Sequence, residues 1–121
     1  MTSIGSKNID SPDEERRFDK GRVQLVTVGD VTVGRATFEP GWRWSECVKP
    51  IAQTDSCQFG HKTYIISGRL GVRLDDGTEA EFGPGDVAVI PPGHDGWVVG
   101  DDPCVSIDFD DAARDYAKPP S

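Results

Sequence analysis

The stretch Gly83–Trp97, GPGDVAVIPPGHDGW, decides the fold. A Gly-Pro-Gly-Asp turn leads into a short apolar run, Val87 to Ile90, which the segment Pro91-Pro92-Gly93 then ends. Because proline cannot donate to a sheet ladder, this run is predicted to be a strand that stops at an edge or corner of a sheet. His94 follows the break directly, and a histidine in that place can point into the mouth of a barrel.

Short predicted strands separated by turn signals occupy most of the chain. Gly29-Asp30 and Asp76-Gly77 are two-residue hairpin turns between such strands. Turn signals every 8 to 12 residues are typical of an all-β sandwich or barrel. We expect strands over residues 23–28, 31–38, 63–66, 70–74, 79–82, 87–90, 97–99 and 105–109, with a possible strand over 42–48, a loop over 49–59 and one helical turn over 112–118.

Length, charge and cysteine content limit the possible functions. The 121 residues suffice for one domain, with a flexible tail or strap over 1–18, a barrel over 19–111 and a C-terminal tail over 112–121. The net charge of −8 argues against nucleic acid or an anionic membrane as partner, because both need a basic face. No secretory signal is visible, and three cysteines do not make a small-domain disulfide framework, so we expect a cytoplasmic setting.

Two glycine-bounded patterns lie in this chain. In the second, Gly85 is followed after five residues by Pro91-Pro92-Gly93, and His94 stands two residues before the place, Gly96, where a histidine would complete the pattern. The first pattern resembles a motif of a known family, which begins at a glycine, carries His-x-His and then a glutamate, and ends at another glycine; here other residues stand in the ligand places.

The first pattern fits in two registers. It starts at Gly41 with Cys47 and Lys49 in the two histidine places, and ends at Gly68 with His61 in the glutamate place. Counting back from His61 instead puts Asp55 and Cys57 in the histidine places.

With both patterns, roughly residues 35 to 110 resemble the cupin superfamily. The resemblance implies an all-β double-stranded β-helix (jelly-roll) cupin barrel that forms a homodimer paired through its N-terminal strands. It also implies a site for iron, manganese or nickel. None of the four expected ligands is the expected residue at the expected place, which argues against a metal site of the family type.

The two histidines, His61 and His94, are the first candidates for catalysis or metal binding. Imidazole suits both general acid/base work near neutral pH and metal ligation. Cys47 is the candidate third ligand, with Cys57 a lesser one. A Cys-His-His set with an open fourth position suits a divalent metal, zinc or iron, which we expect to be weakly held. Cys104 is expected in the core.

Four further residues are candidates for a site at the mouth of the predicted barrel. Glu46 could act as a base if an apolar pocket raises its pKa, although a solvated acid is the simpler interpretation. Trp42, Trp44 and Tyr64 could line a pocket for a flat or apolar ligand, although aromatic residues in so small a barrel more often serve packing.

Three classes of function agree with these residues. The first is an enzyme that acts on a small organic substrate through a His-based site. The second is a ligand-sensing module without turnover, and the third is a dimerisation barrel. One fold hosts many chemistries, so the choice depends on the site.

Overall fold

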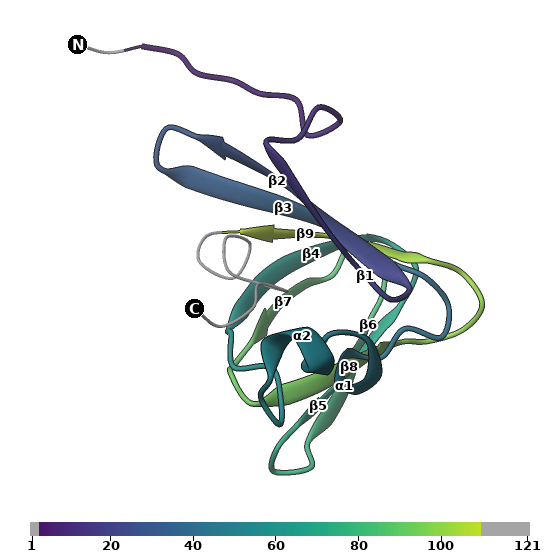
Figure 1. Cartoon of the computed structure of the whole chain (residues 1–121). Helices are drawn as coiled ribbons and strands as arrows, with labels where there is room; N and C mark the ends of the chain where they lie inside the picture. Colours follow the sequence, from purple (N-terminus) through teal and green to yellow (C-terminus); the bar gives the residue numbers. More distant parts are fainter. Residues whose placement is uncertain (1–2, 110–121) are drawn as a thin grey trace.

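The computed structural model describes residues 3–109 and folds them into two antiparallel sheets (Figure 1). Adjacent strands of the larger sheet are, in order, β1 (Glu14–Phe18), β2 (Gly21–Val28), β3 (Val31–Phe38), β9 (Cys104–Phe109), β4 (His61–Ser67) and β7 (Val87–Ile90). Those of the smaller sheet are β6 (Glu79–Phe82), β5 (Leu70–Leu74) and β8 (His94–Val98). The jelly-roll arrangement predicted from the sequence is confirmed, although backbone pairing does not close the described strands into one continuous ring.

The predicted hairpins and most predicted strands are present. Gly29 has φ +61° between β2 and β3, and Gly77 has φ +93° between β5 and β6. These left-handed conformations are the ones that the two-residue turns require. The turn around Pro92 separates β7 from β8, and β8 begins at His94, earlier than expected.

The predicted strand over 42–48 is wrong, because α1 (Trp44–Cys47) forms there, followed by α2 (Lys49–Ala52) in the predicted loop. The first turn of α1 is held from a distant strand: Asp95 Oδ1 accepts a hydrogen bond of 3.0 Å from the backbone N–H of Ser45. This contact joins residues fifty positions apart, so local sequence patterns do not reveal it.

The sequence placed residues 14–18 in a tail, but they form the edge strand β1, which pairs with β2. Charged side chains dominate β1, and charge is a usual way of protecting a sheet edge. Phe18, at its end, packs against Phe38 of the core, with ring centroids 6.1 Å apart. The helical turn and tail expected after residue 111 lie outside the described residues.

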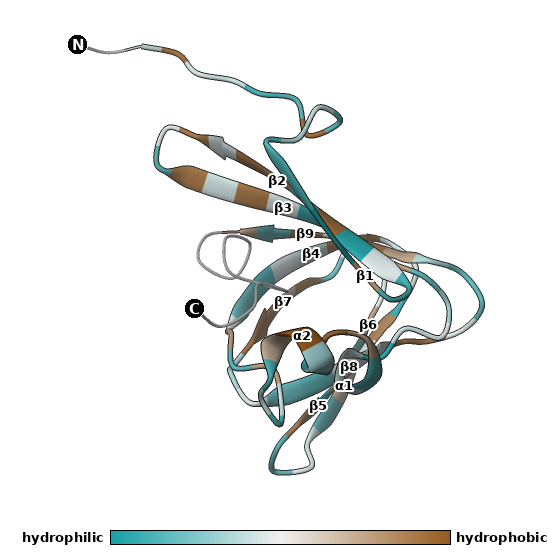
Figure 2. Cartoon of the chain, viewed as in Figure 1, coloured by the Kyte–Doolittle hydropathy of each residue, from teal (hydrophilic) through white to brown (hydrophobic). Residues whose placement is uncertain are grey.

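The core lies between the two sheets. Hydrophobic and hydrophilic residues are interspersed along the strands (Figure 2). On β3, for example, Ala36 and Phe38 are buried while Val31 is exposed. Ile65 and Cys104 are completely buried, the latter as expected. Within residues 3–109, no helix has the length and apolar character needed to cross a membrane.

Candidate functional site

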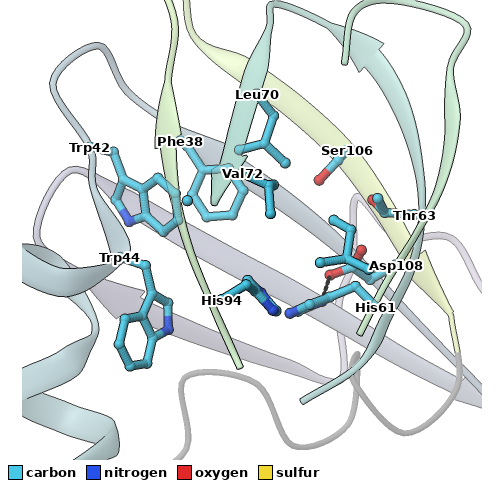
Figure 3. Close-up of a pocket in the computed structure, with 12 residues that line it drawn as sticks. Phe38, Trp42, Trp44, His61, Thr63, Leu70, Val72, His94, Ser106 and Asp108 are labelled. Carbon is cyan, nitrogen blue, oxygen red and sulfur yellow. Dashed lines mark hydrogen bonds and ion pairs between the residues drawn. The ribbon is translucent and has the colours of Figure 1, made fainter. Parts of the chain in front are cut away.

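A small cavity of about 40 Å³ lies between the sheets (Figure 3). Its apolar wall consists of Phe38, Trp42, Trp44, Leu70, Val72 and Ile90. Its polar side consists of His61, Thr63, His94, Ser106 and Asp108, with Gly96 completing the lining. Of the residues proposed from the sequence, the structure therefore brings His61, His94, Trp42 and Trp44 to one cavity.

The two histidines enter the cavity from opposite sheets. His61 is the first residue of β4 and His94 the first of β8, with exposed fractions of 7% and 5%. Their rings meet edge to face with centroids 5.0 Å apart, and ring nitrogens of the two residues face each other in Figure 3.

Cys57 completes this group. Its Sγ lies 3.5 Å from His61 Nε2, and one ligand atom from each of Cys57, His61 and His94 lies within 4.8 Å of the other two. The loop that carries Cys57 is fixed to the start of β8, because the Cys57 N–H donates to the His94 carbonyl at 2.8 Å and the Gly93 N–H donates to the Cys57 carbonyl at 2.7 Å.

Each imidazole ring is oriented by a contact at its Nδ1 nitrogen. His94 Nδ1 lies 2.8 Å from the Pro91 carbonyl, which can only accept, so this nitrogen carries the proton. His61 Nδ1 lies 3.3 Å from Asp108 Oδ2. A histidine that binds a metal is commonly held in this way by a carbonyl or carboxylate, which leaves Nε2 directed at the ligand position.

Burial and hydrogen bonding together shift two pKa values strongly. Burial alone raises the pKa of the Cys57 thiol, but hydrogen bonds with His61 and His94 outweigh it and lower that pKa to about 6. Burial alone lowers the pKa of His61, but its hydrogen bonds with Asp108 and Cys57 outweigh it and raise that pKa to about 10. At neutral pH the metal-free pair is therefore a thiolate beside an imidazolium.

Three residues proposed from the sequence lie away from the cavity. Cys47 lies in α1, with Sγ 3.8 Å from Asp19 Oδ2. Glu46 is exposed and pairs with Arg43 at 3.7 Å. Tyr64 is 41% exposed because strand alternation turns it to the face opposite Thr63.

Two functional candidates were underestimated or missed. The second register of the first pattern places Cys57 at a ligand position, and the structure agrees with that register over the one that favours Cys47. Asp108 was not proposed at all, although its alternation with Ile107 and Phe109 in the last predicted strand was visible. Only its contact with His61 reveals its role.

The donor set fits a zinc ion. With Zn–S about 2.3 Å and Zn–N about 2.0–2.1 Å at a tetrahedral angle, sulfur and nitrogen ligands lie about 3.6 Å apart. The distance of 3.5 Å between Cys57 Sγ and His61 Nε2 agrees with this expected separation of two zinc ligands. Thiolate and imidazole are both ligands that zinc prefers. The residues present can therefore hold a metal, through a different set from that of the family pattern.

Several solved structures share this fold. The polyketide cyclase RemF from Streptomyces resistomycificus is 18% identical with TM-score 0.60, and the match covers 88% of this chain and 78% of that one. A cupin sugar phosphate isomerase from Silicibacter pomeroyi is 21% identical with TM-score 0.59, with coverage of 86% and 73%.

Oxalate decarboxylase from Lactobacillus farciminis, in a formate complex, is a much longer relative. It is 18% identical with TM-score 0.58, and the match covers 79% of this chain. This chain spans only 30% of that oxalate decarboxylase, so the similarity concerns part of a larger protein. No curated protein matches the chain.

The sequence itself matches one family. The match is to the EutQ-like cupin domain and covers residues 51–101, the part that contains Cys57, His61 and His94. This match agrees with the two-sheet fold and with the shared fold of the solved structures. Residues 51–101 are therefore similar to a EutQ-like cupin domain, and the chain has the fold of the cupin structures it matches.

Proposed function

We propose that this barrel binds a divalent metal ion, zinc in preference to iron, through Cys57, His61 and His94, and that it acts on a small organic substrate in the adjoining cavity. The observation that carries the proposal is the convergence of three buried donor atoms within 4.8 Å, beside a cavity that two of the three residues line. Catalytic zinc sites commonly have three protein ligands and one open position.

When bound, such a metal would supply a Lewis acid and a water of lowered pKa. The residues of the chain prepare the site for it. Asp108 and the Pro91 carbonyl hold the two rings so that each can present Nε2, and Cys57 is already ionised at neutral pH. His61 has to give up its Nε2 proton to become a ligand, so binding of the metal should release a proton.

The cavity restricts what can react there. Its volume of about 40 Å³ is far below the ~300–1,000 Å³ of pockets for drug-sized ligands, so the cavity suits a small ligand in this conformation. The surrounding Trp42, Phe38 and Val72 exclude bulk water and strengthen the electrostatic interactions within the cavity.

A second function is favoured by one observation. Cys57, His61 and Asp108 stand in the order of a nucleophile, a base and its orienting acid, with separations of 3.5 Å and 3.3 Å. This arrangement suits covalent catalysis by the Cys57 thiolate without a metal. We place it second because Cys57 does not line the cavity, whereas His61 and His94 do.

Metal analysis tests the proposal. The full chain, purified without added metal, is analysed for its elements and is then titrated with zinc against a competing chelator. We expect one equivalent of zinc in the wild type and its loss in Cys57→Ser and His61→Ala. Cys47→Ser and Cys104→Ser are the matched controls, because both cysteines are also buried but lie outside the donor cluster.

Two results would count against the metal site. One is equal zinc affinity in wild type and Cys57→Ser, and the other is loss of zinc in Cys47→Ser alone. Asp108→Asn gives a finer check, because removing a group that orients a ligand typically weakens metal binding about 10–100-fold without abolishing it.

A further inference from the structure

We propose that the cavity receives a neutral, hydroxyl-bearing end of its ligand, such as a hydroxymethyl group, held by Thr63 and Asp108. This inference rests on the proposed function, for which it names the substrate class. Its evidence is separate from the metal donors and comes from the polar wall formed by β4 and β9.

Thr63 is a buried polar group that lacks a partner. Its side chain lines the cavity and only 3% of the residue is exposed, yet Oγ1 has no hydrogen-bond partner among the described residues. A buried polar atom left unsatisfied destabilises the folded state, and native proteins keep few of them. A hydroxyl that faces a binding cavity satisfies its hydrogen bond when the ligand is present.

Further oxygen atoms lie beside Thr63. In the pairing of β4 with β9, Thr63 is opposite Asp108, and the next inward residue, Ile65, is opposite Ser106. Figure 3 shows Thr63, Ser106 and Asp108 on one side of the cavity, across from Trp42 and Trp44. The oxygen-bearing side chains of the cavity wall therefore lie on this side, whereas Trp42 Nε1, also without a partner among the described residues, lies on the other.

The chemistry of the wall selects a hydroxyl group. A carboxylate group such as that of Asp108 offers acceptor oxygens, whereas the Thr63 hydroxyl can both donate and accept. A ligand hydroxyl can donate to Asp108 and accept from Thr63 at the same time. A methyl group would satisfy neither residue.

The wall also argues against charged ligand ends. A carboxylate would face the Asp108 carboxylate, which lies opposite Thr63 in the pairing of β4 with β9. An ammonium group can only donate, so it would leave the hydroxyl proton of Thr63 without an acceptor. The opposite wall, with Phe38 and Leu70, suits the carbon atoms of the ligand. The small volume suits a short end group.

Two probes of equal size separate these possibilities. Ethane-1,2-diol and acetate each have two carbon and two oxygen atoms, but only the first is neutral and carries hydroxyls. Each is titrated into the full chain, with and without zinc, while the backbone amide signals are followed by NMR. We expect saturable shifts centred on Thr63 and Asp108 with the diol, and at least about tenfold weaker binding of acetate.

Variants assign the contact to Thr63. Thr63→Val keeps the shape of the side chain and removes the hydroxyl. It should weaken diol binding about three- to tenfold, the effect of one ordinary hydrogen bond, and should raise the melting temperature of the free protein because the unsatisfied atom is gone. Thr63→Ser should retain binding. Thr37→Val, a change outside the cavity, should leave binding unchanged.

Equal diol affinity in wild type and Thr63→Val would overturn the inference, and so would acetate binding as tight as that of the diol. Zinc affinity is measured in parallel on the same proteins. If zinc binds but the diol does not, the substrate class is wrong and the metal site stands. If the diol binds through Thr63 but zinc does not bind, the metal site is wrong and the hydroxyl pocket stands.

Discussion

Replacement of His61 by glutamine should convert Cys57 from a thiolate to a neutral thiol at neutral pH in the metal-free protein. In the wild type, the imidazolium of His61 lies 3.5 Å from Cys57 Sγ and opposes the effect of burial on the thiol. Glutamine can still donate a hydrogen bond but carries no charge. The change therefore isolates the contribution of the positive charge.

The expected magnitude follows from the distance. Two unit charges 3.5 Å apart attract by about 5 kcal/mol at an effective dielectric constant of 20. The fall of the Cys57 pKa from 9.0 to about 6 corresponds to about 4 kcal/mol. Hydrogen bonds with the residue at position 61 and with His94 also lower this pKa and remain in His61→Gln, so loss of the charge should raise the pKa of Cys57 from about 6 to above 7.

The ultraviolet absorbance of the thiolate, followed against pH, measures this shift. The difference between each protein and its Cys57→Ser counterpart removes the signals of Cys47 and Cys104. We expect a midpoint near 6 in wild type. Cys104 should ionise separately, because burial and then the charge of Asp108 raise its pKa to about 11.

The explanation by charge would be refuted by a Cys57 midpoint above 8 in wild type, or by an unchanged midpoint in His61→Gln. Asp108→Asn serves as an intermediate case. It removes the carboxylate that favours the imidazolium, so the midpoint of Cys57 should lie between those of the other two proteins.

Four further predictions concern stability and assembly. In metal-free protein the free energy of unfolding should change little between pH 6.5 and 9. The raised pKa of His61 stabilises the folded state fully below pH 6.5, and this contribution is lost as the pH rises to about 10. The lowered pKa of Cys57 stabilises the folded state fully above pH 9, and this contribution is lost as the pH falls to about 6. Between pH 6.5 and 9 the loss of the first contribution is offset by the gain of the second. A steep rise or fall in urea titrations over this range would contradict the coupling. Ile65→Ala should cost about 2–5 kcal/mol in the same titrations, whereas the exposed Ile66→Ala should cost much less. Gly68→Ala should destabilise strongly, because φ is +76° and a Cβ would meet the Pro103 backbone, while Gly77→Ala, also at positive φ but in open space, should cost less. Sedimentation should show a homodimer, since β7 lies at an edge of the described sheet and carries the exposed Val87 and Val89, and a clean monomer at micromolar concentration would reject this.

The sequence predicted the sheets because their signals are local. Gly29-Asp30 and Asp76-Gly77 each specify a turn within a few residues, and Pro91-Pro92 ends a strand wherever it occurs. Short segments between such turns are predicted to be strands. The two histidines were also within reach, because His94 directly follows the Pro91-Pro92-Gly93 break, although its strand was expected only from residue 97.

Contacts distant in sequence explain what was missed. The helix α1 depends on Asp95, which lies on another strand and is fifty residues from Ser45. Cys57 and Cys47 look alike as isolated cysteines, and only the backbone pairing of Cys57 with His94 distinguishes them. Asp108 lies forty-seven residues from His61, so no spacing rule connects the two.

The paired backbone hydrogen bonds between Cys57 and the start of β8 have a kinetic consequence. Because these bonds join the main chains of Cys57 and His94, rotation of their side chains alone cannot separate the loop that carries Cys57 from β8. The two segments must part as one cooperative unit, with the free energy of a local unfolding event. Movement of Cys57 away from His94 therefore requires this unit to open, so the persistence of the donor cluster depends on the main chain as well as on its side chains.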